Sequence, residues 1–225
     1  MRQPELETAP DSALKTQRSR LRRAHERGLY DRESVYQVLD AMPLAHIGYQ
    51  INGATSVLPT LQWREGGHVY WHGSSASRAI RAMEGAEVCL SVTCMDGYVL
   101  ARSAFHHSVN FRSAMLFGVA EKVTGSEAKA ASLKAMVERI FPGRWETLRP
   151  MTEQEVKATA VLRMPITEGA AKIRSGPPKD DEEDYALPVW AGVVPMAMEL
   201  QPPQPDPANL EGVAMPDHLS RIRIG

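Results

Sequence analysis

Hydrophobic residues in the middle of the chain alternate with polar ones, a spacing of two that is typical of half-buried β-strands. The alternation is clearest over residues 88–94, where one face is apolar and the other carries only small side chains. We expect the apolar face to point into a core. The small face fits either a surface beneath a flat ligand or a face that meets solvent or another strand. Its residues are Cys89, Ser91 and Thr93.

The same period predicts several further short strands. Asn52-Gly53 is a strong hairpin signal between two of them, because both turn positions tolerate a positive φ. Asp96-Gly97 is predicted to turn the chain between two others. The predicted strands are 44–51, 54–63, 68–72, 88–94, 98–102, 112–123, 159–166 and 169–174.

Helices are predicted at fewer places, about 16–28, 31–42, 77–83 and 126–140, with a short one after Thr152. Asp31 and Ser126 are expected to cap two of these helices, and Thr152 with Glu155 forms a capping box. Many short strands with few helices predict a mainly-β fold, a small barrel with peripheral helices.

Composition narrows the function classes. The formal net charge is −1 and the pI about 6.7, which argues against a nucleic-acid-binding protein. No run of about 18 apolar residues predicts a membrane span, and the first residues lack the apolar core of a signal peptide. Cys89 and Cys94 are five positions apart on one strand, so they face opposite sides and predict no disulfide. We therefore expect a cytoplasmic protein without nucleic-acid or membrane partners.

Three segments differ in composition. Residues 1–28 read as an N-terminal arm and charged helix, 29–176 as the barrel domain, and 177–225 as an extended C-terminal tail. The tail is rich in proline and carries an acidic run at 180–184, for which a solvated loop is the simplest interpretation. An apolar stretch that begins at Trp190 predicts docking on the barrel or on a partner subunit.

One candidate site follows the strand at 68–72, where a Gly-Ser turn opens a short helix. The first amides of a helix and its positive dipole end favour an anion. Arg78 in the first turn suits a phosphate, which a guanidinium binds in bidentate fashion. The alternative is that Ser75 merely caps the helix and Arg78 points to solvent. The candidate residues are His72, Gly73, Ser74, Ser77 and Arg78.

A second candidate segment is 103–113, whose polar residues could hydrogen-bond a ligand. Adjacent histidines on a strand point to opposite faces, so His106 and His107 predict no metal site without a third ligand. Asn110, Arg112 and Ser113 complete the group. The motifs of dinucleotide-binding folds, P-loops, serine hydrolases and zinc proteases are absent from the sequence.

These segments, taken in order, resemble the FMN-binding split-barrel superfamily, in the pyridoxamine 5'-phosphate oxidase-like branch related to nitroimidazole-resistance proteins. The resemblance runs from about Tyr30 to Pro195. It rests on Tyr30-Asp31-Arg32-Glu33, Leu58-Pro59-Thr60 with Trp63-Arg64, Tyr70-Trp71-His72-Gly73-Ser74, the stretches 96–103 and 106–113, Pro142-Gly143-Arg144-Trp145, the stretch 171–176 and Trp190-Ala191-Gly192-Val193.

The resemblance implies a six-stranded Greek-key barrel and a homodimer with FMN at the subunit interface. By position, the backbone of Leu58, Pro59, Thr60 and Leu61 is expected along the isoalloxazine ring. The candidate residues between His72 and Arg78, together with Arg112 and Ser113, are expected to surround the phosphate and the ribityl chain. Trp190 is expected to close over the flavin, and Thr93 and Asn110 are further candidate contacts.

The function that follows is a flavin-dependent oxidoreductase acting on a small-molecule substrate. His106 or His107 is a candidate general acid, because imidazole titrates near neutral pH. The full substrate-phosphate pattern of pyridoxamine-phosphate oxidases is not recognisable, which argues against vitamin B6 oxidation. The alternatives are a non-catalytic flavin carrier or redox sensor and, third, a haem-binding split barrel.

Overall fold

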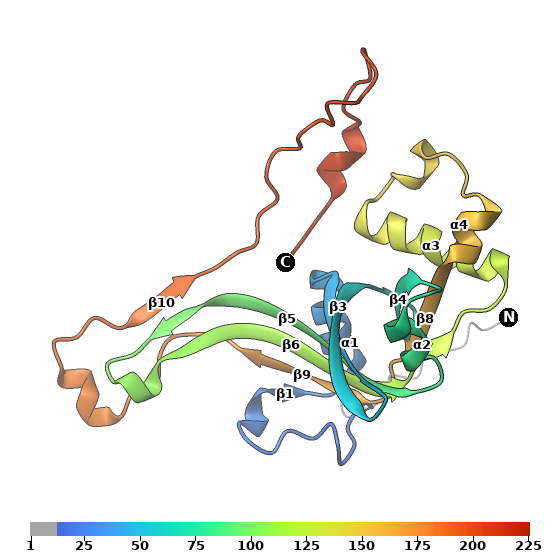
Figure 1. Ribbon diagram of the computed structural model, residues 1–225. Helices are drawn as coiled ribbons and strands as arrows, with labels where there is room; N and C mark the ends of the chain where they lie inside the picture. Colours follow the sequence, from blue (N-terminus) through green and yellow to red (C-terminus); the bar gives the residue numbers. More distant parts are fainter. Residues whose placement is uncertain (1–12) are drawn as a thin grey trace, which may run out of the picture.

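The computed structural model describes residues 13–225 as a curled antiparallel sheet with a few helices at its margins (Figure 1). The strand order is β1-β9-β6-β5-β2-β3-β4-β8-β7, and β10 pairs with β5. The strands are β1 (Gly28–Leu29), β2 (Leu44–Ile51), β3 (Ala54–Glu65), β4 (His68–Ser74), β5 (Glu87–Leu100), β6 (Ser108–Val119), β7 (Glu121–Lys122), β8 (Thr159–Pro165), β9 (Gly169–Arg174) and β10 (Gly192–Pro195).

Residues 13–225 also contain four α-helices and five short 3-10 helices. The α-helices are α1 (Arg32–Ala41), α2 (Arg78–Met83), α3 (Ser126–Ile140) and α4 (Glu153–Ala158). The 3-10 helices are η1 (His25–Arg27), η2 (Ala104–His106), η3 (Trp145–Thr147), η4 (Glu182–Ala186) and η5 (Asp217–Arg221).

The prediction of a mainly-β split barrel with peripheral helices is confirmed. The described residues contain ten strands rather than six. The difference lies mainly in short strands, because β1, β7 and β10 are two to four residues long and pair only at sheet margins.

The core fills the inside of the curled sheet. Trp71, Leu90 and Leu116 are fully buried there, together with residues of α1 and α2. A smaller cluster lies beneath α3, where Trp63 stacks on Tyr70 with ring centroids 5.6 Å apart. Burying this apolar surface is the main stabilising contribution to the fold.

Several local predictions are confirmed. Asn52 and Gly53 have φ of 51° and 77°, the two positive values that a tight hairpin turn requires. Asp31 caps α1 by accepting from the Ser34 amide at 2.7 Å. Thr152 and Glu155 form the predicted capping box at the start of α4.

The prediction of a charged helix at 16–28 is wrong. Over this stretch the structure has turns, η1 and the start of β1. The segment has no continuous apolar stripe to bury, and its charges pair elsewhere, since Arg18 forms ion pairs with Glu87 and Glu168. Ser126 likewise does not cap α3, because Gly125 occupies the N-cap position.

The predicted turn at Asp96-Gly97 is also wrong. β5 runs without interruption from Glu87 to Leu100, with a β-bulge between Met95 and Gly97. β6 correspondingly starts at Ser108 rather than at the predicted position 112, and it ends at Val119. β5 and β6 therefore form a long ribbon that projects from the barrel (Figure 1).

None of the helices in residues 13–225 combines the length and the apolar character that crossing a bilayer requires.

Candidate functional site

Several small or polar side chains gather on the outer face of the sheet formed by β2, β3, β5 and β6. His46 pairs with Pro59 on one side and with Ser91 on the other. Ser91 pairs in turn with Met115, and Thr93 pairs with Ser113. The predicted small face of 88–94 is therefore continuous with neighbouring strands on the outside of the barrel.

Exposed apolar side chains accompany the polar centre of this outer face. They are 39% to 62% exposed, so they present a sizeable apolar area in the single chain. Burial raises the pKa of Cys89, whose thiol is therefore neutral at pH 7. Small polar side chains with apolar neighbours suit a planar ring system. The apolar residues are Leu44, Val57, Leu61, Met95 and Met115.

The predicted stretch Leu58–Leu61 lies along β3 beside this face. Pro59 and Leu61 are exposed, whereas Leu58 and Thr60 are half-buried and Leu58 packs against the core. Sequence reasoning missed His46, which lies exposed between Pro59 and Ser91. The sequence pattern could have indicated this position, because His46 lies between the apolar residues Ala45 and Ile47, which are buried, and so must face the opposite side of the strand.

The predicted anion site lies where β4 leads into α2. Ser77 caps the helix through the Ile80 amide, and Ser74 accepts from the Ala76 amide at 3.2 Å. Gly73 is required because a Cβ there would lie 2.9 Å from Ile80. Arg78 is exposed, and no ion pair to it is found within residues 13–225.

His72 is half-buried at the end of β4. Its ring centroid lies 6.0 Å from that of Trp63. Burial lowers the pKa of His72, so its imidazole is neutral at pH 7. Its buried Nδ1 has no hydrogen-bond partner, which leaves a polar atom that a ligand or water can satisfy.

Arg112 and Asn110 make contacts within the ribbon. The Arg112 guanidinium binds Asp96 through Nε at 3.0 Å and Nη2 at 2.8 Å, and this pairing raises the pKa of Arg112. Asn110 is buried, donates to the Gly176 carbonyl at 3.1 Å and accepts from Arg174. The Ser113 hydroxyl, on the outer face, donates to the Lys172 carbonyl at 3.3 Å.

His106 and His107 lie in the loop at the far end of the ribbon. This loop is roughly 20 Å along the strand from Thr93, at about 3.3 Å per residue. The His107 Nδ1 donates to the Ser103 carbonyl at 2.8 Å, which leaves Nε2 as an acceptor. His107 also lines a shallow hollow with Tyr98, Val99, Leu100, Ser108 and Val194.

The tail lies along the ribbon and then returns towards the barrel. β10 pairs with β5 at 97–100, and the amide of Gly225 donates to the Ala41 carbonyl at 2.9 Å. Trp190 is 68% exposed and lies just before β10. The interpretation of the acidic run as a solvated loop is wrong at Asp180, whose side chain is fully buried against Arg102 at 3.0 Å.

Burial opposes the charge of Asp180, but hydrogen bonds from the Arg102 amide and guanidinium outweigh it. The pKa of Asp180 therefore lies below its usual value. This buried pair holds the tail against the ribbon, a long-range contact that local composition could not indicate.

Within one chain, the predicted site residues thus fall into separate groups. Pro59, Leu61, Thr93 and Ser113 share the outer face. The residues from His72 to Arg78 surround the start of α2. Asn110 and Arg112 lie along the ribbon, and His106, His107 and Trp190 lie near its tip.

Solved structures of other proteins resemble this chain over most of its length. The flavocytochrome Anf3 from Azotobacter vinelandii is 48% identical, with a TM-score of 0.92 over 96% of this chain and 100% of that one. The FAD and heme binding protein from Mycobacterium smegmatis is 35% identical, with a TM-score of 0.84 over 88% and 97% of the two chains.

A candidate 5-nitroimidazole antibiotic resistance protein from Bacteroides thetaiotaomicron shares the fold alone, at 17% identity and a TM-score of 0.54 over 65% and 86% of the two chains. A comparison with curated proteins gave no match. The family model described as pyridoxamine 5'-phosphate oxidase matches residues 31–173, which include β2 to β8 and most of β9. The chain therefore belongs to the pyridoxamine 5'-phosphate oxidase family of split-barrel proteins.

Proposed function

We propose that this protein binds a flavin nucleotide and works as a redox protein on a small-molecule substrate. The observation that carries the proposal is the likeness to flavocytochrome Anf3, 48% identical over 96% of this chain, ribbon and tail included. The FAD and heme binding protein of M. smegmatis supports it at 35% identity. A flavin would supply hydride or electron transfer, and the protein would bind the flavin and orient it towards the substrate.

The outer face fits the ring of such a cofactor. Ser91, Thr93 and Ser113 offer small side chains on neighbouring strands, and their exposed apolar neighbours can cover an aromatic ring. His46 faces the same surface and can donate a hydrogen bond to a ring heteroatom. We propose FMN as the flavin, with FAD as the alternative that the M. smegmatis protein suggests.

The start of α2 fits the phosphate. Arg78 is exposed without an ion pair in the described part of the chain, and the neighbouring serines supply hydroxyl groups. Arg112 is a weaker candidate, because Asp96 already neutralises its guanidinium.

We propose a homodimer with the flavin at the subunit interface. Residues 189–200 of the tail expose six large apolar side chains, each 40% exposed or more. A second copy of the chain that covers this surface would bring its Trp190 towards a flavin on the outer face. These side chains are Val189, Trp190, Val194, Met196, Met198 and Leu200.

Haem binding is the second candidate function, favoured by the same two relatives. Haem proteins commonly use a neutral histidine as axial ligand. His72 has a neutral, half-buried ring with an unsatisfied nitrogen. His107 has its Nδ1–H held by a carbonyl, so its Nε2 is free beside an apolar hollow.

The visible absorption spectrum of purified protein tests the flavin. We expect flavin bands that survive desalting after FMN or FAD is added, at about one flavin per chain, and reduction of these bands by NADH or NADPH. Chromatography of the released flavin distinguishes FMN from FAD, and light scattering on the same sample tests the dimer. A protein that retains neither flavin contradicts the proposal. Retained flavin that no pyridine nucleotide reduces favours the carrier or sensor.

Replacing Arg78 tests the phosphate site. Arg78→Ala is expected to weaken flavin binding about 10- to 150-fold, because a charge-assisted hydrogen bond contributes about 1.5–3 kcal/mol. Arg32→Ala is the matched control, since Arg32 is also the exposed first residue of a helix. Equal affinities of the two variants, measured by quenching of flavin fluorescence, would show that the phosphate binds elsewhere.

Haem addition tests the second function. We expect a Soret band with haem, lost in one of the single variants His72→Ala and His107→Ala and kept in the other. Circular dichroism checks that both variants fold. No Soret band in the wild type, or an unchanged band in both variants, argues against these histidines as ligands.

A further inference from the structure

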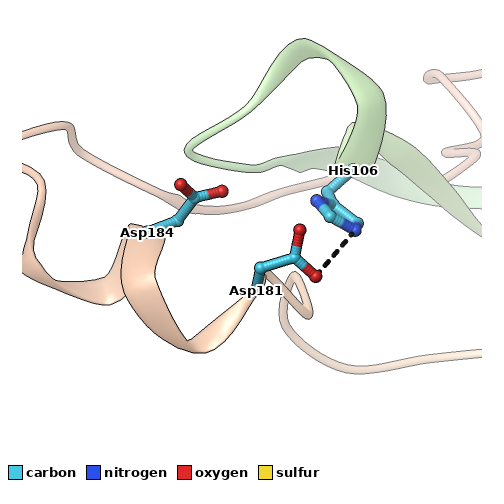
Figure 2. A group of neighbouring side chains, drawn as sticks. All are labelled: His106, Asp181 and Asp184. Carbon is cyan, nitrogen blue, oxygen red and sulfur yellow. Dashed lines mark ion pairs between the residues drawn. The ribbon is translucent and has the colours of Figure 1, made fainter.

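Three potential metal ligands from two distant parts of the sequence meet at the tip of the ribbon. His106 belongs to the loop between β5 and β6, whereas Asp181 and Asp184 belong to the tail (Figure 2). One ligand atom from each residue lies within 4.8 Å of the others. None of these three side chains is used in the flavin and haem sites proposed above, although His107, the next residue in the loop, is a candidate haem ligand.

The imidazole of His106 is held in an orientation that suits coordination. Its Nδ1 is hydrogen-bonded to the Ser103 hydroxyl at 2.9 Å, and its Nε2 faces the Asp181 carboxylate at 3.9 Å. The second distance is too long for a hydrogen bond. Metal-bound histidines commonly have their other ring nitrogen fixed in this way, which orients the ring and sets its tautomer.

The two aspartates lie on the same side of η4. Asp181 is the N-cap of this 3-10 helix, and the Asp184 amide donates to the Asp181 carbonyl at 3.0 Å. A 3-10 helix has three residues per turn, so side chains three positions apart are aligned. Two carboxylates so placed repel each other, and a cation between them removes that repulsion.

Neighbouring contacts position both halves of the cluster. Asp180 is buried and accepts hydrogen bonds from the Arg102 amide at 2.9 Å and from its guanidinium at 3.0 Å. The same guanidinium lies 4.9 Å from the centre of the Tyr185 ring. Arg102 thus contacts residues on either side of Asp181 and Asp184 but pairs with neither of these two aspartates. Their carboxylates are therefore available to a ligand.

We propose that His106, Asp181 and Asp184 bind a divalent transition-metal ion, Zn²⁺ being the representative. The imidazole nitrogen favours Zn²⁺ and other divalent first-row transition-metal ions over Mg²⁺ and Ca²⁺, which prefer oxygen ligands alone. Zinc bonds of about 2.0–2.2 Å require ligand atoms roughly 3.5 Å apart. The Asp181 side chain is 79% exposed, so it is free to rotate and bring its carboxylate closer to the other two ligands. Water would complete the coordination. The ion would join the tail to the loop at the tip of the ribbon.

Zinc titration of the untagged full-length protein tests this site. The protein is first treated with a chelator, and affinity is measured by competition with a chromogenic zinc indicator at 150 mM salt. We expect one zinc per chain, with affinity reduced at least about 10-fold in His106→Ala and in the double variant Asp181→Asn/Asp184→Asn.

The double variant Glu182→Gln/Glu183→Gln is the matched control. It removes the same charge from the same 3-10 helix but no proposed ligand, and it should change zinc affinity by no more than about 2-fold at this salt concentration. Zinc should also slow proteolysis of the tail in the wild type and the control, but not in His106→Ala. Equal losses of affinity in both double variants, or unchanged affinity in His106→Ala, would overturn the proposal.

Discussion

The pairing of β5 with β6 is the interaction on which the rest of the structure depends. It runs from Glu87 opposite Val119 to Val99 opposite Ser108. Its first half forms part of the barrel wall, with Leu90 and Leu116 in the core and Ser91 and Met115 outside. Its second half extends beyond the barrel and provides the edge on which β10 and the tail lie.

The β-bulge between Met95 and Gly97 links these two halves. It inserts an extra residue in β5, and such bulges increase the local twist of a ribbon. Asp96, the extra residue, binds Arg112 across the pair. Gly97 admits the close approach of the tail, because a Cβ there would lie 2.8 Å from the Val194 carbonyl oxygen. The bulge thus fixes where the ribbon leaves the barrel and where the tail docks.

Patterns that depend on neighbouring residues were predicted well. The alternation at 88–94, the Asn52-Gly53 hairpin and the caps at Asp31 and Thr152 are properties of short segments, and the structure has all of them. The Asp96-Gly97 dipeptide is also a local turn signal, but there the long-range pairing with β6 and β10 dominates.

The candidate site was less predictable, because its residues are brought together by strand pairing and by the tail, which are long-range contacts. The predicted residues of the outer face follow from alternation along single strands, whereas His46 joins them through strand pairing. Arg112 had no visible partner in the sequence, yet Asp96 lies opposite across the ribbon. The burial of Asp180, and the meeting of His106 with Asp181 and Asp184, depend on a tail that returns about 75 residues later in the chain.

Blocking the outer face tests the central claim, that the surface around Ser91 carries the flavin ring. Ser91→Trp places a large ring at its centre, whereas Val119→Trp places the same ring at the end of β6, opposite Glu87. Flavin affinity is measured by fluorescence quenching, with circular dichroism to check folding. The account predicts that Ser91→Trp abolishes flavin binding and that Val119→Trp retains it. A folded Ser91→Trp variant with wild-type affinity would contradict it.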